Sequence, residues 1–154
     1  MICIVQRVTE AQVSVDGQIV GQIGVGMVVL AAVERGDTRA DAEWTAAKLV
    51  GLRIFRSGDK HFEEDVQQIG GAVLLVSNFT VAAATRKGRR PSFDSAADSA
   101  DAERIFDDLV RSVRGRGIPV QTGRFGASML VSLINDGPAT FIVQSDERIW
   151  GGGL

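Results

Sequence analysis

The first quarter of the chain alternates short apolar runs with turn residues. Residues 2–8 and 11–15 are apolar or alternate in the manner of β-strands. An Asp-Gly pair at 16–17 is a hairpin signal, and a further strand is predicted over 18–23. Residues 27–33 are apolar at every position, which predicts a central strand that is buried on both faces.

Two later segments have helical periodicity. The first runs from about Arg39 to Val50, and either Asp37 or Thr38 can cap it. The second, Ser99 to Arg114, spaces its apolar residues alternately by three and one. It has carboxylates near its start and arginines near its end, an order that suits the helix dipole.

Further strands are predicted around the helices, over residues 52–56, 72–76, 118–121, 128–134 and 139–144. Strands outnumber helices, and short turns join many of them. We therefore predict one α+β domain, in which a largely antiparallel sheet or partial barrel packs on two helices. It should span residues 1–145, and residues 146–154, which include three consecutive glycines, should form a flexible tail.

Composition bears on the number of domains and on the cellular compartment. A chain of 154 residues with 45% apolar and 23% charged residues is long enough for one domain with a substantial core. The single cysteine, Cys3, excludes an internal disulfide, fits a reducing compartment and reads as a buried structural thiol. No signal peptide is visible and the longest apolar run is too short for a bilayer, so we expect a cytoplasmic protein with no membrane partner.

The net charge of −2 means that any contact with nucleic acid needs a local basic patch. The chain has one such patch, in the polar loop over residues 85–95. Four cations stand there within five positions: Arg86, Lys87, Arg89 and Arg90. They form either a phosphate clamp or a solvated charged loop.

Several kinds of catalytic chemistry are missing from the sequence. The only histidine, His61, cannot form a two-histidine metal motif, and the acidic residues beside it read as a solvated turn. There is no Gly-x-Ser-x-Gly elbow and no phosphate-binding P-loop. We therefore predict neither a metal nor a cofactor.

One polar stretch directly follows the predicted strand over 72–76. It consists of Ser77, Asn78, Phe79 and Thr80. Polar side chains in this position are either the solvent rim of a sheet or a site placed on a rigid scaffold.

Two further stretches combine unusual residues. Residues 122–127 place Phe125 among small residues such as Gly126, and the ring either stacks on a base or belongs to the core. Residues 135–138, Asn-Asp-Gly-Pro, lie between two predicted strands. They form either a hairpin turn or a rigid Gly137-Pro138 corner that presents its backbone carbonyls.

Together with Gln6-Arg7-Val8, these stretches resemble, in the same order and spacing, the D-aminoacyl-tRNA deacylase family. The resemblance covers residues 1 to about 145. It implies a cytoplasmic homodimer that hydrolyses the ester joining a D-amino acid to tRNA and that also clears glycine from mischarged tRNA. The sequence departs from the usual family residues at Asn78, Val81, Ala139 and 61–64.

The resemblance also implies roles for the catalytic stretch. The backbone N–H groups of Phe79 and Thr80 would stabilise an oxyanion, beside Ser77 and Asn78. The Thr80 hydroxyl would be a nucleophile or a positioning group. No base is evident near it, so we favour positioning, with attack by a water that the terminal ribose 2′-hydroxyl assists.

Other residues would bind and select the substrate. Gly137-Pro138, with a cis peptide bond, would reach into the partner subunit's site, where its carbonyl oxygens would exclude an L side chain. Arg7 would hold this corner in place. The phosphates at the 3′ end of the tRNA would contact the cations of the basic loop. The terminal adenine would contact Phe125, Gly126 and Met129.

Two alternative functions stay open on the sequence. A non-catalytic RNA-binding β module would use the basic loop and Phe125. A small-ester hydrolase would use Ser77 or Thr80 with His61 as its general base. A DNA partner is not expected.

Overall fold

Strand β1 (Ile2–Val15) organises the sheet because it pairs along both of its edges. The computed structural model describes residues 1–145, so the flexible tail predicted over 146–154 lies outside the described residues. Along one edge, β1 pairs antiparallel with β3 (Gly26–Ala32) and then with β2 (Gln18–Ile23). Strand β8 (Leu130–Gln144) runs antiparallel along the other edge.

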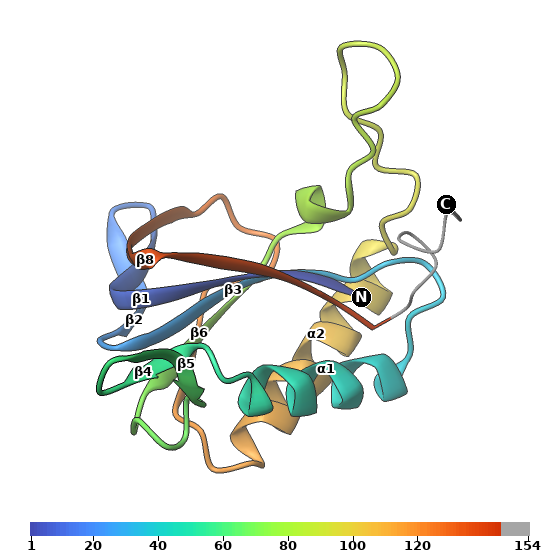
Figure 1. The fold of residues 1–154 in the computed structure, drawn as a ribbon. Helices are drawn as coiled ribbons and strands as arrows, with labels where there is room; N and C mark the ends of the chain where they lie inside the picture. Colours follow the sequence, from blue (N-terminus) through green and yellow to red (C-terminus); the bar gives the residue numbers. More distant parts are fainter. Residues whose placement is uncertain (146–154) are drawn as a thin grey trace.

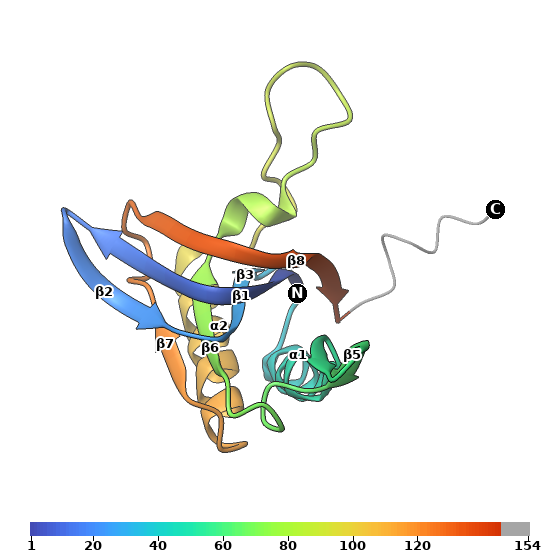
Figure 2. The ribbon, with the colours of Figure 1, turned by 60° about the vertical axis from the view of Figure 1, so that its left-hand side comes forward.

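Two shorter strands extend the sheet in parallel. Strand β6 (Ala72–Ser77) pairs with β3, and β7 (Val120–Thr122) pairs with β6. The result is a mostly antiparallel sheet that curls into a nearly closed barrel, as the views in Figures 1 and 2 show. The predicted α+β domain with two helices is confirmed at this level.

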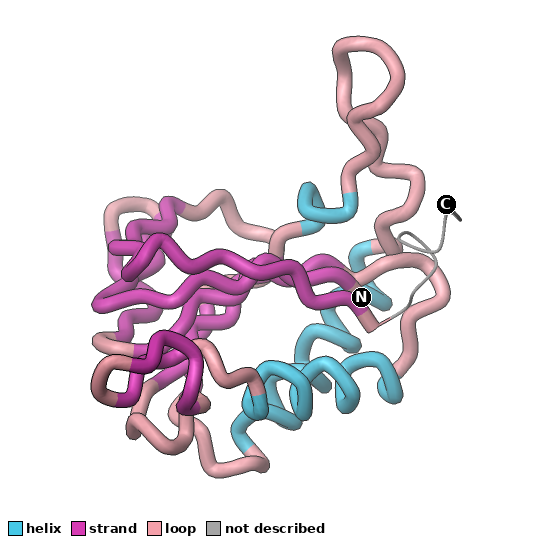
Figure 3. The backbone as a smooth tube through the Cα atoms, in the orientation of Figure 1, coloured by secondary structure: helices cyan, strands magenta, loops and turns pink. Residues whose placement is uncertain are grey.

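The helices α1 (Arg39–Gly51) and α2 (Ser99–Arg114) lie together against one face of the sheet (Figure 3). Alternate residues of β3 point to this face and join the main core with the helices, while the others, such as Val28, point into a second core with Leu74 and Val76. Burial on both faces explains why β3 is apolar throughout. No helix in residues 1–145 has the length and apolar character to cross a membrane.

Cys3 is fully buried in the main core. Burial raises the pKa of its thiol to about 12. A thiol held protonated in an apolar setting is a structural residue.

Two predicted breaks between strands are wrong, because in each case the chain continues through the break as one long strand. Residues 2–8 and 11–15 form the single 14-residue strand β1, and residues 128–134 and 139–144 form the single 15-residue strand β8. Both halves of β8 pair with β1 in the same antiparallel sense, so the chain does not reverse at Asn-Asp-Gly-Pro. Residues 136–139 form a bulge opposite Arg7, because Asn135 pairs with Val8 and Thr140 with Gln6.

A small hairpin stands apart from the main sheet. It consists of β4 (Phe55–Ser57) and β5 (Lys60–Glu64), where the sequence indicated a strand over 52–56 followed by a turn and an acidic stretch. Strand β5 is polar and largely exposed, so it lacks the alternation that marks a half-buried strand.

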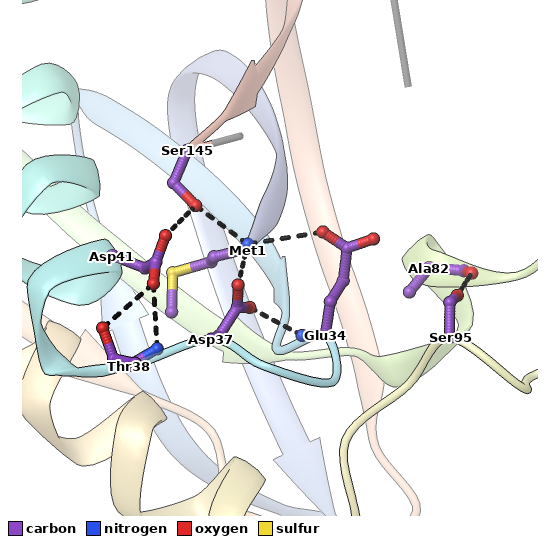
Figure 4. Close-up of polar contacts among 8 residues, drawn as sticks. All are labelled: Met1, Glu34, Asp37, Thr38, Asp41, Ala82, Ser95 and Ser145. Carbon is purple, nitrogen blue, oxygen red and sulfur yellow. Dashed lines mark hydrogen bonds and ion pairs between the residues drawn. The ribbon is translucent and has the colours of Figure 1, made fainter. Parts of the chain in front are cut away.

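A polar cluster fastens the start of α1 to the ends of β1 and β8 (Figure 4). The ammonium group of Met1 donates to Asp37 Oδ1 at 2.6 Å and to Ser145 Oγ at 2.9 Å. Ser145 Oγ in turn donates to Asp41, whose other oxygen accepts from the backbone N–H of Thr38 at 2.9 Å. Of the two predicted cap residues, Asp37 and Thr38, it is Thr38 that caps the helix, in a capping box with Asp41.

This cluster makes stability depend on the ionisation of Asp41. Partial burial acts to raise the pKa of Asp41, but hydrogen bonds from Thr38 and Ser145 outweigh it and lower that pKa below 3.8. A lowered folded-state pKa gives stability that is present above the unfolded pKa and is lost as the pH falls through the folded value.

Asp41→Asn should therefore destabilise the fold by about 1 kcal/mol at pH 7, the usual effect of losing a helix cap. The difference from wild type should begin to shrink as the pH falls below about 3.9, the pKa of an unfolded Asp, because the unfolded chain then binds a proton that the folded carboxylate resists. Urea unfolding at pH 7 and pH 3 measures this, with Asp107→Asn, on the exposed face of α2, as the control. A difference that is independent of pH would contradict the assignment.

Candidate functional site

The end of β6 carries the predicted catalytic stretch. Ser77 pairs with Ala31 of β3, and the N–H of Asn78 donates to the Ala31 carbonyl at 2.8 Å. The chain then enters a 3₁₀ turn, η1 (Phe79–Ala82), which the N–H of Val81 closes onto the Asn78 carbonyl. The first N–H groups of such a turn, those of Phe79 and Thr80, have no partner within it.

A cavity of about 750 Å³ opens beside this stretch. Strands β3, β6 and β8, helix α2 and the segment after β7 all contribute to its walls, which are mostly apolar. Of the predicted site residues, it brings together Ser77, Asn78, Phe79, Phe125, Gly126 and Met129. Neither Thr80 nor His61 is among the residues that line it.

Phe79 lies at the edge of the cavity. Its side chain is 58% exposed and packs edge-on against Phe93, with 5.1 Å between the ring centroids. Phe125 is half-buried and packs against Phe106 of α2 at 6.2 Å. Phe125 therefore belongs to the core, one of the two alternatives left by the sequence, and it also lines the cavity.

The Thr80 hydroxyl is held by a neighbouring side chain. It donates to Asn78 Oδ1 at 2.5 Å, and an amide oxygen is not a general base. No other side-chain hydrogen bond of Thr80 is found among residues 1–145. The geometry orients the hydroxyl and does not activate it.

Arg7 and the Gly137-Pro138 corner meet at a second position, in the bulge of β8. Arg7 is only 3% exposed, and its Nε donates to the Asp136 carbonyl at 3.0 Å and pairs with Asp136 Oδ2 at 3.3 Å. The Gly137-Pro138 bond is cis. Asn135 closes the bulge, since its Oδ1 accepts from Ala139 N and its Nδ2 donates to Thr140 Oγ1.

The backbone at Gly137 admits only glycine. Its φ is +138°, and a Cβ built there would lie 3.0 Å from Arg7 Nη2 and 2.9 Å from the nitrogen of Ala139. The side chain of Arg7 thus packs directly against the Gly137 main chain.

The corner and the cavity do not meet within one chain. Arg7 pairs with Met27, whereas Ala31, the partner of Ser77, pairs with Cys3. Cys3 and Arg7 are four residues apart on β1, a separation of about 13 Å. Neither Gly137 nor Pro138 lines the cavity.

The basic loop follows η1 in the chain and projects from the body of the protein (Figure 1). Two backbone hydrogen bonds between Ala84 and Ser92 close its base, and Ser95 Oγ donates to the Ala82 carbonyl at 2.7 Å (Figure 4). Its cations are all exposed: Arg86, Lys87, Arg89 and Arg90. The loop presents its positive charge to solvent.

Sequence reasoning missed several supporting groups. The carbonyls of Ile54 and His61 accept from Arg7 Nη1, which no local pattern could reveal. A Cβ at Gly123 would lie 2.5 Å from the sulfur of Met129, so this glycine gives Met129 its place in the cavity wall. In residues 1–145, no group of three or more His, Cys, Asp or Glu side chains is placed to hold a metal.

Comparison with known proteins agrees with the motifs. The family model described as D-Tyr-tRNA(Tyr) deacylase matches residues 4–144. The D-aminoacyl-tRNA deacylase of Desulfitobacterium hafniense is 47% identical over 145 residues, which are 94% of this chain and 97% of that protein. That of Geobacter sulfurreducens is 49% identical over 148 residues, which are 96% of this chain and 97% of that protein.

Two solved structures share the fold. The c-Myc DNA Unwinding Element Binding Protein superposes with a TM-score of 0.91 at 34% identity, over 95% of this chain and 99% of that chain. A probable eukaryotic D-amino acid tRNA deacylase superposes with a TM-score of 0.81 at 17% identity, over 92% of this chain and 97% of that chain. The resemblance found in the sequence motifs is confirmed: the chain belongs to the D-aminoacyl-tRNA deacylase family, a family of hydrolases.

Proposed function

We propose that this protein hydrolyses the ester bond of D-aminoacyl-tRNA in the cytoplasm, releasing the D-amino acid and tRNA, and that it also removes glycine from mischarged tRNA. It would act as a homodimer in which Gly137-Pro138 of one subunit rejects L-aminoacyl groups at the cavity of the other. The observation that carries the proposal is the cavity, whose mostly apolar walls include both Phe79 and Phe125.

The cavity suits the 3′ end of tRNA. A volume of about 750 Å³ is within the range of small-molecule sites. Phe125 and Met129 offer an apolar surface for a purine, and Gly126 allows its close approach. The exposed cations of the 85–95 loop, which projects from the body of the protein after η1, would meet the preceding phosphates.

Hydrolysis needs little beyond placement, because an aminoacyl ester is already reactive. The N–H groups of Phe79 and Thr80 would receive the developing oxyanion. The Thr80 hydroxyl, which donates to Asn78 Oδ1, would position the substrate. The 2′-hydroxyl of the terminal ribose would assist the attacking water.

The separation of corner and cavity supports a shared site. Neither Gly137 nor Pro138 lines the Phe79 cavity of its own chain. Strand β8 also presents large exposed apolar side chains: Leu130, Ile134 and Ile142. A second copy that covered this face could bring its corner to the cavity. Main-chain carbonyls close to the substrate α-carbon would admit hydrogen there and exclude a side chain of the wrong hand.

The role of the Phe79 amide is tested by a matched pair of variants. Phe79→Pro removes the N–H at the first position of η1, where proline is tolerated because that N–H has no partner within the turn. It should lower kcat on D-tyrosyl-tRNA by about 10²-fold or more, the effect of losing one oxyanion donor. Phe79→Ala keeps the N–H and should stay within about tenfold of wild type. Equal losses in both variants would show that the ring, and not the amide, matters.

Replacing Thr80 tests positioning against covalent catalysis. Thr80→Ala should reduce the single-turnover rate on D-tyrosyl-tRNA by about fivefold, the effect of one neutral hydrogen bond. A loss of about 10³-fold, or a burst of acyl-enzyme in the wild type, would establish a threonine nucleophile instead.

The chirality filter is tested at Gly137. The Cβ of Gly137→Ala would displace Arg7 and the corner, so the ratio of D- to L-tyrosyl-tRNA hydrolysis should fall by about tenfold or more. Gly17→Ala is the control, since its φ is also positive, at +77°, but its Cβ meets nothing within 4 Å. An unchanged ratio would rule the corner out as the filter.

Mixed dimers separate a shared site from a site within one chain. If the corner acts across the interface, a dimer of one Gly137→Ala and one Phe79→Pro subunit contains one intact site. Co-expressed subunits with different tags, purified as the mixed species, should then recover about half of the wild-type D-selective activity. No recovery would place both elements in the same chain's site.

A further inference from the structure

The surroundings of Arg7 contain an aromatic ring that no motif identifies. Phe62 lies on the β4–β5 hairpin, and the guanidinium carbon of Arg7 stands 5.8 Å from the centroid of its ring. Phe62 is 56% exposed, although a large apolar residue gains from burial. Its edge-on packing against Phe141 of β8, at 6.0 Å, connects the hairpin to the strand that carries the corner.

The hairpin also supplies acceptors for Arg7. Nη1 donates to the Ile54 carbonyl, just before β4, at 2.7 Å and to the His61 carbonyl of β5 at 3.4 Å. Nε donates to Asp136 on the other side. These bonds run in or near the guanidinium plane, because a guanidinium donates in its own plane.

Hydrogen bonds of this kind leave the flat faces of the guanidinium without support. An aromatic ring is the protein group that suits such a face, because it attracts the cation and resists tilting out of the plane. Phe62 is placed to do this at the buried charge that packs against Gly137.

We propose that Phe62 is a positioning residue for the Gly137-Pro138 corner. It acts through Arg7 and, together with the Ile54 and His61 carbonyls, makes the β4–β5 hairpin the support of that corner. This inference rests on the proposed function, in which Gly137-Pro138 excludes L-aminoacyl groups. It assigns the support of that corner to a hairpin that lies outside both the cavity and the bulge. Phe62 does not contact the substrate, so its loss should affect selectivity more than turnover.

Two variants of Phe62 give the test. Phe62→Leu keeps an apolar side chain without the π face. It should lower the ratio of D- to L-tyrosyl-tRNA hydrolysis about two- to fivefold, the effect of one exposed cation–π contact. The kcat on the D-substrate should change less. Phe62→Tyr keeps the ring and should retain the wild-type ratio. Trp44→Leu, an exposed aromatic on α1, is the matched control and should also leave the ratio unchanged.

A second readout does not use catalysis. In protein labelled with ¹⁵N-arginine, the Nε–H of Arg7 should exchange with water faster in Phe62→Leu than in wild type, and at the wild-type rate in Phe62→Tyr. An exchange rate unchanged by Phe62→Leu overturns the inference even if the protein proves not to be a deacylase. Faster exchange with an unchanged D-to-L ratio in an active enzyme also overturns it. A wild type that does not distinguish the two hands defeats the proposed function alone.

Discussion

The buried guanidinium of Arg7 is the interaction on which the special geometry of this protein depends. A charge that is 3% exposed is tolerable only when its donors are satisfied. Arg7 meets this need with carbonyls from three separate segments: Ile54, His61 and Asp136. The guanidinium therefore holds the bulge and the hairpin in place through these hydrogen bonds. The same bonds replace the water that the buried charge has lost.

The rest of the fold places a cavity at a fixed distance from that charge. Strand β3 is buried on both faces, so it is held between two cores and has little freedom to shift. Its register with β1 positions Arg7, and its register with β6 positions Ser77. The spacing between bulge and cavity is therefore set by strand pairing, which is more rigid than any loop connection.

The parts of the fold that local patterns encode could be predicted from the sequence, and the parts that depend on distant partners could not. The helix over 99–114 and the central strand over 27–33 follow from periodicity. Residues 135–138 carry turn chemistry, and the same residues suit a reversal or a bulge; pairing with β1 decides between them. Likewise, motifs indicated that Ser77 to Phe79 and Phe125 to Met129 belong together, but only the packed structure shows that the bulge lies elsewhere and that a polar hairpin supports it.

The register of β8 has a consequence for how its length can evolve. Glu10 pairs with Ile134 and Gln6 with Thr140, so β1 advances four residues where β8 advances six. The excess of two is even, and for this reason even-numbered residues of β8 face outward on both sides of the bulge, from Leu130 to Ile142. Gain or loss of a single residue between 135 and 139 would turn one half of the strand over and exchange Val143 with its exposed neighbours. Length changes in this segment therefore keep both halves of β8 facing the core when they come in multiples of two, and an odd change requires a further bulge to absorb it.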